Sequence, residues 1–406
     1  MRALHLSTEF PPLIYGGLGT AVGGLAFALA EAGISVAVLL VGNTGRGGYA
    51  GQAPNLVRGA TEGREDREVA IFEVSYHDFE AMALLTAKWK PDVLHLHSYW
   101  LWPTAEALRR RLGVPLVYTV HSLDRAEYEL GQGPSECLSQ WTGQEGVILA
   151  ADRIIALSRS ERELLCRYCP GVDDRVRIVG NGIEDWNTAP QPRENNDSGP
   201  VVLFSGRFVD RKGIWELIEA VEIVLAQMTD VRFILAGGHR HCGAEQMEAW
   251  LLPPGLRERR GNIRFTGWLT PEEMSGCYRA ADILVVPSWY EPFGMVVLEG
   301  MLHGLAVAAS AVGGPAEILE HGRTGLLFPP RDGKALAGAI IELGSNPHRR
   351  HALAKAGAEE VRRTWLWPRV VEKIRSVYEE LAPQPTLFPL GPPDGSPETP
   401  KAPYRA

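Results

Sequence analysis

Short apolar runs alternate with longer amphipathic stretches from the start of the chain. Residues 2–7 ("RALHLS") and 35–42 ("SVAVLLVG") are short and mainly apolar, as strands buried on both faces of a parallel sheet are. Between them, residues 16–33 ("GGLGTAVGGLAFALAEAG") open on glycines and then repeat apolar side chains at helical spacing. The three segments together predict a βαβ unit.

The same alternation recurs in two series. The first continues with strands at 91–98, 115–122 and 151–158 and helices at 102–113 and 159–167. The second has strands at 200–206, 231–238, 263–268 and 282–288 and helices at 213–228 and 270–281. Strands apolar on both faces that alternate with helices predict an α/β fold with two doubly wound, Rossmann-like parallel-sheet domains; the family resemblance described below implies that they face each other across a cleft.

A polar stretch separates the two series. Residues 187–199 ("NTAPQPRENNDSG") contain prolines and have no periodicity, which is typical of an interdomain linker. We therefore expect a first domain at residues 1–186 and a second at 200–365. A final helix is expected at about 366–382, and the proline-rich residues 383–406 predict a disordered tail.

Composition argues against several classes of protein. The 406 residues, 45% hydrophobic and 22% charged, are typical of a two-domain globular chain. With a formal net charge of −8 and no basic run longer than Arg109–Arg111, nucleic-acid binding is not expected. Contact with a membrane surface would rest on that triplet alone, which is more typical of a solvated helix face. Without a signal peptide or an apolar run of roughly 18 residues, the chain is expected to be cytoplasmic.

The cysteines do not indicate a disulfide framework, because they are odd in number and scattered. Cys166 and Cys169 form a CxxC, and His239, His241 and Cys242 lie close together, so zinc is one interpretation. No second CxxC exists, and the first lies in a helical pattern. We therefore favour buried thiols and surface histidines, and expect no metal.

Three loops at strand ends carry candidate chemistry. Gly16 and Gly17 precede the first predicted helix, where backbone N–H groups could approach a phosphate. The spacing is not GxGxxG and no acid ends the second strand, so a nicotinamide cofactor is disfavoured. A tight turn that packs helix on sheet is the structural alternative.

The second loop is "SGRFVDRKG", which puts Arg207 and Lys212 between a strand and a helix of domain two. Two cations at the ligand edge of a parallel sheet could hold a diphosphate that leaves as an anion. With Asp210 and Arg211 between them, a solvated charged turn is the alternative.

The third loop is "YEPFGMVVLE", with acids at Glu291 and Glu299. Gly294, Met295 and Val296 are expected to open a helix whose N–H groups could hold phosphate. Eight residues make 80° more than two helical turns, so we assign the first acid to the loop and the second to the helix. One carboxylate could hold sugar hydroxyls and the other a ribose; the alternative is a capping acid and a surface acid.

Histidines and aromatic residues end two strands of domain one. His97 and His121 could donate to substrate hydroxyls, or be satisfied strand-end histidines. Tyr99 and Trp100 could stack on a sugar ring, or belong to the core. These side chains are the weaker, acceptor-side part of the predicted site, apart from His121.

These motifs together resemble the family-four retaining glycosyltransferases of the GT-B fold, in particular the glycogen and starch synthase branch. The resemblance covers roughly residues 1–382, in this order: "PPLIYGGLG", "YTVHSLD", "GNGI", "SGRFVDRKG", "EPFGMVVLEGM" and "AVGGPAEIL". It implies a nucleotide sugar held mainly by domain two, and a last helix that packs back on domain one.

The resemblance also implies a role for each matching residue. Glu291, His121, Arg207 and Lys212 would form the catalytic set, in which Glu291 orients the transferred sugar and the two cations hold the diphosphate. Donor-binding residues would be Gly16, Gly17, Asn181, Gly294, Met295, Val296 and Glu299. The family transfers sugar with retention, with the leaving phosphate as the base, and needs no cofactor or metal.

The expected activity is transfer of a hexosyl, most simply glucosyl, unit from ADP- or UDP-glucose to an α-glucan or oligosaccharide. Two departures from bacterial glycogen synthases put polymer elongation in doubt, since Tyr15 replaces a lysine and Ser98 an aspartate. A small acceptor, such as a sugar phosphate, an aminocyclitol or a lipid-linked sugar, is therefore the alternative, and a non-catalytic nucleotide-sugar sensor is another. The sequence defines neither the base of the donor nor an oligomeric state.

Overall fold

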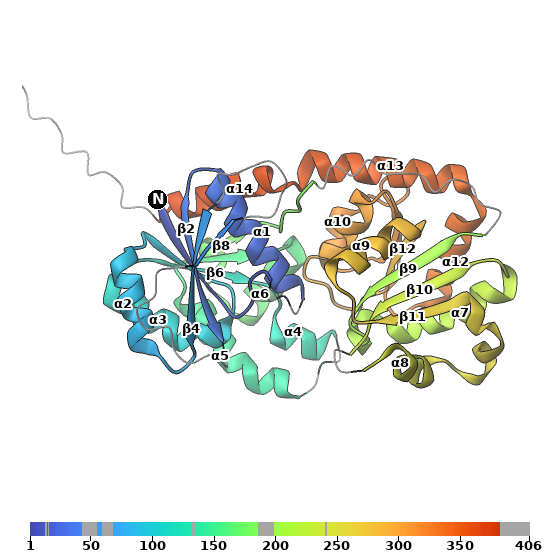
Figure 1. The fold of residues 1–406 in the computed structure, drawn as a ribbon, viewed down its shortest axis with the longest axis horizontal. Coiled ribbons are helices and arrows are strands. Elements are labelled where there is room, and N and C mark those ends of the chain that lie inside the picture. The colour runs from blue at the N-terminus through green and yellow to red at the C-terminus, as the bar shows by residue number, and fades with distance from the viewer. Residues whose placement is uncertain are drawn as a thin grey trace, which may run out of the picture.

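Two α/β domains lie side by side along the long axis of the molecule (Figure 1). The computed structural model describes residues 1–12, 14, 16–42, 55–58, 68–131, 133, 135–185, 199–239 and 242–381. The predicted linker, apart from Gly199, and the predicted tail lie outside the described residues. The predicted fold class is confirmed, because each domain is built on a parallel sheet covered by helices.

The sheet of domain one has the strand order β3-β4-β2-β1-β5-β6-β7-β8, and all its pairs are parallel except β3 with β4. The sequence analysis did not predict β3 and β4. The strands are β1 (Arg2–Ser7), β2 (Ser35–Gly42), β3 (Asn55–Arg58), β4 (Glu68–Ser75), β5 (Val93–Leu96), β6 (Leu116–Val120), β7 (Arg153–Ala156) and β8 (Val176–Ile178).

Helices cover both faces of this sheet, which is why its central strands, such as β2 and β6, are mainly apolar. One face packs against α1 (Gly17–Glu31) and α14 (Trp367–Glu379). The other face packs against α2 (Phe79–Trp89), α3 (Trp102–Leu112), α4 (Asp124–Glu129), α5 (Glu136–Ala150) and α6 (Arg159–Tyr168). Helices α2, α4 and α5 had no counterpart in the sequence analysis.

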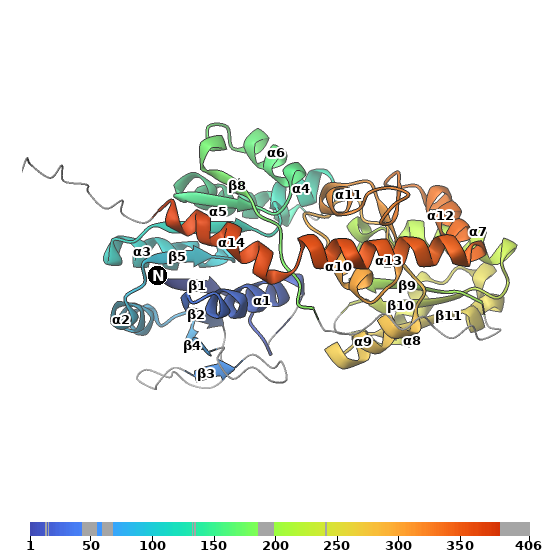
Figure 2. The ribbon, with the colours of Figure 1, turned by 90° about the horizontal axis from the view of Figure 1, so that it is seen from above.

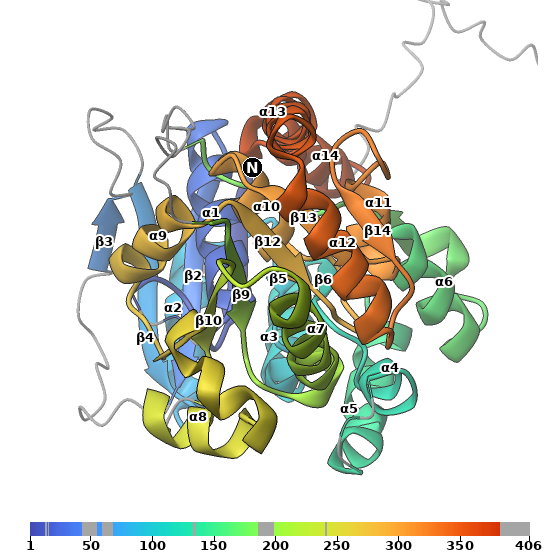
Figure 3. The same cartoon turned by 90° about the vertical axis from the view of Figure 1, so that its right-hand side faces the viewer.

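Domain two has a fully parallel sheet in the order β11-β10-β9-β12-β13-β14. Its strands are β9 (Val201–Gly206), β10 (Arg232–Gly237), β11 (Ile263–Gly267), β12 (Ile283–Val286), β13 (Ala306–Ser310) and β14 (Leu326–Phe328). Its helices are α7 (Ile214–Gln227), α8 (Ala244–Leu251), α9 (Pro271–Ala280), α10 (Met295–Leu302), α11 (Gly313–Ile318), α12 (Gly333–Ser345) and α13 (Pro347–Thr364). They flank both faces of the sheet (Figure 3).

The last two helices run across both domains (Figure 2). Helix α13 packs on domain two, whereas α14 packs on domain one beside α1. Between them, Ile183 forms a backbone bridge with Leu366, and the Ile183 N–H donates to the Trp365 carbonyl at 2.9 Å. The two segments that join the domains are therefore bonded to each other.

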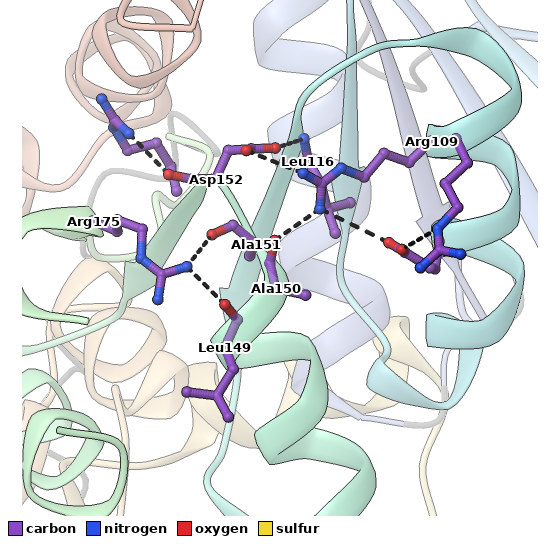
Figure 4. A network of polar contacts seen from close by, with 10 residues as sticks. Arg109, Leu116, Leu149, Ala150, Ala151, Asp152 and Arg175 are labelled. Atoms are coloured by element: carbon purple, nitrogen blue, oxygen red, sulfur yellow. Dashed lines mark hydrogen bonds and ion pairs between the residues drawn. The ribbon is translucent and has the colours of Figure 1, made fainter. Parts of the chain in front are cut away.

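A polar network orders the starting edge of the domain-one sheet, opposite its carboxyl ends (Figure 4). Asp152 accepts from the Leu116 N–H at 2.8 Å and from Arg109 at 3.2 Å, and Arg109 also donates to the Ala150 carbonyl at 2.8 Å. Nearby, Arg175 donates to the Ala151 carbonyl at 2.6 Å. Arg109, the first of the basic triplet, thus joins α3 to the loop before β7.

Candidate functional site

The strand ends that carry the predicted residues face one another across the domain interface. Tyr290 of domain two donates its hydroxyl to Glu161 of domain one at 2.7 Å and accepts from the Leu123 N–H at 3.0 Å. Arg211 forms an ion pair with Glu127 at 3.3 Å. These contacts bring the loop after β6, which carries His121, next to the loops of domain two.

Lys212 and Glu291, which directly follow Arg211 and Tyr290 in the chain, form an ion pair next to these interdomain contacts. Ser288 also donates to Glu291 at 3.2 Å, and only 19% of the Lys212 side chain and 10% of the Glu291 side chain are exposed. The pair therefore lies in an environment where charge interactions are stronger than in water.

Backbone packing between two loops sets the position of this pair. The Trp289 N–H donates to the Arg211 carbonyl at 2.7 Å. Gly213, with φ 70°, directly follows Lys212, and a Cβ at this position would lie 1.9 Å from the Pro287 carbonyl oxygen. Only glycine permits this approach at this backbone conformation.

Burial and pairing act against each other on both groups. Burial alone would raise the pKa of Glu291, but Lys212 and Arg211 outweigh it and hold that pKa below its ordinary value. Burial, helped by Arg211 and Arg207, lowers the pKa of Lys212 despite the attraction of Glu291. Lys212, Arg211 and Arg207 outnumber the two carboxylates that pair with them, Glu291 and Glu127, and this surplus of one positive charge favours a further anion here.

Arg207 lies in the loop that leads to Lys212. Its side chain is exposed and forms no ion pair or hydrogen bond with any residue that the structure describes. The guanidinium therefore remains available for a ligand, unlike that of Arg211, which binds Glu127.

The predicted helix opening after Glu291 is α10. Gly294 caps it with φ 94°, and the N–H groups of Met295 and Val296 belong to the first turn, where no helical acceptor exists. The Gly314 N–H donates to the Glu291 carbonyl at 3.0 Å, and a Cβ on Gly314 would lie 2.0 Å from the Phe293 carbonyl oxygen. The glycine pair of α11 thus supports the loop that carries Glu291.

Glu299 lies on α10, half-buried, with one carboxylate oxygen held by Tyr278 at 2.6 Å. The Tyr278 ring is stacked on His303 at 4.6 Å between centroids, which fixes this hydroxyl. Burial raises the pKa of Glu299. Its second oxygen, Oε1, forms no hydrogen bond with another described residue and could accept from a ligand.

On the opposite side, Gly16 and Gly17 stand at the start of α1. A Cβ added to either glycine would meet no other atom within 4 Å, so the backbone there borders open space. Glu9 accepts from the Gly19 N–H of the first turn at 3.3 Å. The N-terminus of α1 is thus partly capped by an acid, and its first residues remain accessible.

His121, His97 and Asn181 line one small cavity of about 10 Å³, room for a single water molecule. Burial lowers the pKa of His121 to about 4, so its ring is neutral at pH 7. His97 is 3% exposed, and both its ring nitrogens are hydrogen-bonded, one of them to His121 at 3.1 Å. The structure therefore places His97 behind His121 rather than at the surface.

Tyr99 and Trp100 are stacked on each other at 4.7 Å between centroids. The Tyr99 hydroxyl donates to Gln140 at 3.4 Å, whereas Trp100 is 51% exposed. Trp100 is thus the side chain of the two with a ring face available for stacking on a sugar.

The residues weighed for zinc do not assemble in the described structure. Cys166 belongs to α6 and Cys169 follows it, and burial raises the pKa of each thiol to about 11. His239 packs against Trp250, and His241 lies outside the described residues. The three-residue group with ligand atoms close together among the described residues is His5, His95 and His97.

Sequence reasoning missed the residues that join the domains. Tyr290 stands inside the motif that was singled out, but its partner Glu161 is distant in the sequence, so no local pattern relates them. The glycine pair at 313 and 314 did carry a signal, since two adjacent glycines before a helix indicate a close backbone approach.

Two facing parallel-sheet domains, with cations and free helix amides at their interface, define a GT-B glycosyltransferase, and the chain belongs to the group 1 glycosyltransferases. The family model "Glycosyl transferases group 1" matches residues 199–346, and "Glycosyltransferase Family 4" matches residues 15–186. The chain is therefore assigned as an enzyme, as expected. Among the described residues, no helix is long and apolar enough to span a membrane.

Relatives of this chain include enzymes named for small phosphorylated products and for a polymer. The chain is 30% identical to an α-maltose-1-phosphate synthase of Mycolicibacterium smegmatis, covering 94% of this chain and 100% of the relative. It is 28% identical to a glycogen synthase of Mycobacterium tuberculosis, with 95% and 98% covered. Among solved structures, it is similar to a sucrose-phosphate synthase of Thermosynechococcus elongatus, with a TM-score of 0.74, 25% identity, and 94% and 98% covered.

Proposed function

We propose that this protein transfers a glucosyl unit from UDP- or ADP-glucose with retention of the anomeric configuration. The observation that carries the proposal is the buried Lys212–Glu291 pair, around which Lys212, Arg211 and Arg207 outnumber the carboxylates Glu291 and Glu127. A donor would put its diphosphate on the cations and its sugar on the acid.

In the proposed reaction, the bond from the sugar's anomeric carbon to the diphosphate breaks and the electron pair leaves with the diphosphate. Lys212, Arg207 and the first amides of α10 stabilise the negative charge that develops there. Because these groups supply the charge, we propose no metal. Glu299 would accept hydrogen bonds from the ribose through its free oxygen.

Glu291 holds hydroxyls of the transferred sugar rather than moving a proton. Its pKa is held below the ordinary value by Lys212 and Arg211 against the effect of burial, so it is an acceptor at neutral pH. With the carboxylate occupied in this way, the leaving phosphate takes the acceptor's proton on the face from which it departs. Attack on that same face retains the configuration.

For the acceptor, we propose a small molecule that carries a phosphate. The similarity to a maltose-1-phosphate synthase and a sucrose-phosphate synthase supports a phosphorylated acceptor. So do Tyr15 and Ser98, which stand where a lysine and an aspartate are expected in polymer-extending enzymes. An α-glucan is the second candidate, supported by the glycogen synthase relative.

The test is a panel of UDP-, ADP- and GDP-glucose, each with glucose 1-phosphate, inositol 3-phosphate, fructose 6-phosphate, maltotetraose or glycogen. Released nucleotide is measured, and the product is analysed by proton NMR. We expect an α-linked product with one phosphorylated acceptor. A β-linked product would refute retention, and transfer to glycogen alone would establish the second candidate. No release from any donor would refute the proposed donor.

A further inference from the structure

A continuous row of hydrogen bonds crosses the buried face of domain one beneath α14. The Thr119 hydroxyl contacts His95 Nε2 at 2.7 Å, and His95 Nδ1 contacts the Tyr378 hydroxyl at 2.6 Å. The same hydroxyl contacts His5 Nε2 at 3.4 Å. This first half links three strands, β6, β5 and β1, to the last helix of the chain.

The second half runs toward the candidate site. His5 Nδ1 contacts His97 Nε2 at 2.9 Å, and His97 Nδ1 contacts His121 Nε2 at 3.1 Å. The other nitrogen of His121, Nδ1, forms no hydrogen bond with any residue that the structure describes. We call the whole row the histidine chain; its members in order are Thr119, His95, Tyr378, His5, His97 and His121.

Strand register explains how these side chains meet. His5 of β1 and His95 of β5 are paired residues on neighbouring parallel strands. Successive side chains of a strand alternate between the two faces, so His97, two residues after His95, lies on the same face. This is the face that α14 covers, and α14 brings the Tyr378 hydroxyl between His5 and His95.

All four rings of the histidine chain are neutral at pH 7. Burial lowers the pKa of His5 to about 3 and that of His121 to about 4. Burial also lowers the pKa of His95 and of His97 well below the ordinary value, and repulsion from the neighbouring histidines adds to it. A neutral imidazole carries one N–H and one lone pair.

One proton per ring makes the whole row directional. Each contact needs one donor and one acceptor, so every ring that accepts on one side must donate on the other. Thr119 is 4% exposed, and its hydroxyl has no acceptor other than His95 among the described residues. A buried hydroxyl donates where it can, since an unused donor costs about 1–3 kcal/mol. Each member of the row then donates its hydrogen bond to the next member, starting at Thr119 and ending at His121.

We propose that the histidine chain fixes the tautomer of His121, so that its Nδ1 carries the proton and donates a hydrogen bond to an oxygen of the bound donor. Tyr378 is then a positioning residue that acts on the interdomain site from α14. The identity of that oxygen rests on the proposed function, whereas the tautomer does not.

A metal ion at His5, His95 and His97 is the competing use of these rings, whose ligand atoms lie within 4.8 Å of one another. The rings of His5 and His97 are stacked with an angle of 16° between their planes, and His5 Nδ1 is hydrogen-bonded to His97 Nε2. Both nitrogens of His95 are also taken, by Tyr378 and Thr119. Because the lone pairs of these three rings already accept hydrogen bonds from different directions, they do not point toward one metal ion.

The tautomer can be measured in the ligand-free enzyme by nitrogen-15 NMR of histidine side chains, with His121 assigned from the spectrum of His121→Asn. We expect a protonated Nδ1 and an unprotonated Nε2 in the wild type. In Tyr378→Phe the row is cut, and the two nitrogens should move toward averaged shifts. The matched control is Tyr168→Phe, which removes a hydroxyl that donates to Glu129 at 2.8 Å in the same domain.

A protonated Nε2 in the wild type, or an unchanged His121 signal in Tyr378→Phe, would overturn the proposal. So would one equivalent of zinc or cobalt bound by the wild type and lost in His95→Gln. If Tyr378→Phe does not fold, Thr119→Val and Thr119→Ser test the other end of the row. Valine lacks the hydroxyl donor, so Thr119→Val should change the His121 signal, whereas serine retains the donor and Thr119→Ser should not.

Kinetics give the second measurement. Loss of the fixed donor should raise the KM for the nucleotide sugar about tenfold in Tyr378→Phe, with kcat within about twofold, as expected for one ground-state hydrogen bond. Equal KM values for Tyr378→Phe and Tyr168→Phe would overturn the link to the site. If NMR shows the expected tautomer of His121 but the enzyme uses no nucleotide sugar, the proposed function is refuted, whereas the proposed role of the histidine chain is not.

Discussion

Replacing Lys212 by methionine tests the proposed charge stabilisation most directly. Methionine keeps a similar length and volume but removes the charge, so the Lys212–Glu291 ion pair is lost. One donor that contacts a developing oxyanion is worth roughly 10²–10³ in kcat, about 3–4 kcal/mol. We therefore expect kcat to fall by that factor, with a smaller change in KM.

The same substitution has a predictable effect on stability. Breaking a buried ion pair typically costs about 3–5 kcal/mol. Here Ser288 and Arg211 still face Glu291 and both side chains keep some exposure, so we expect roughly 2 kcal/mol. For a domain of this size, that loss lowers Tm by about 4–8 °C.

The assay is initial-rate nucleotide release, with circular dichroism and thermal melts on the same preparations. Lys334→Ala serves as the matched control, because Lys334 is an exposed lysine of the same domain. A folded Lys212→Met enzyme with kcat within about fivefold of the wild type would contradict the oxyanion role.

A double variant separates two ways in which Lys212 could act. If its task were only to neutralise Glu291, then Lys212→Met combined with Glu291→Gln would recover the activity lost in Lys212→Met. If Lys212 binds the diphosphate, the double variant stays as slow as Lys212→Met or slower. Recovery of kcat would therefore refute the reasoning.

Two further variants test other parts of the interface. Glu299→Gln should raise the KM for the nucleotide sugar by about 10- to 100-fold with little change in kcat, since charge-assisted hydrogen bonds are worth about 1.5–3 kcal/mol; a steady-state titration in which kcat falls more than KM rises would contradict it. Burial raises the pKa of Glu161 from 4.5 to about 8. Between these pH values the folded state keeps a proton on Glu161 that the unfolded state loses. The contribution of this residue to the free energy of unfolding therefore falls as pH rises from 4.5 to 8. Glu161→Gln should therefore show a smaller drop in Tm between pH 6 and pH 8.5 than the wild type, and equal drops would count against this assignment.

The sequence predicted the fold well because both sheets are buried on both faces. Apolar runs such as those of β2 and β12 have a single compatible environment, so strand type and parallel pairing follow from the residues themselves. The β3–β4 edge was not predicted from the sequence. Strand β4 alternates buried with more exposed positions, so it lacks the continuous apolar run that marks the central strands.

The positions of the candidate residues were predictable where one loop supplies several of them. Glu291 and the first amides of α10 lie within six residues, and their spacing alone separates a loop acid from a helix acid. The contacts of Tyr290 with Glu161 and of Tyr378 with His95 depend instead on residues far apart in the chain. Such pairs follow from tertiary packing, which no local periodicity encodes.

The return of the chain to domain one has a mechanical consequence. Domain two is connected through two polypeptide segments, and Ile183 and Leu366 bond them to each other where they pass. Because the two segments are bonded to each other, a movement of domain two relative to domain one has to carry both segments together. The return of the chain also means that residues 1–186 lack the Trp367, Val371 and Tyr378 side chains that complete their own core. Truncation after residue 366 would therefore destabilise the first domain, although every residue removed lies beyond the second.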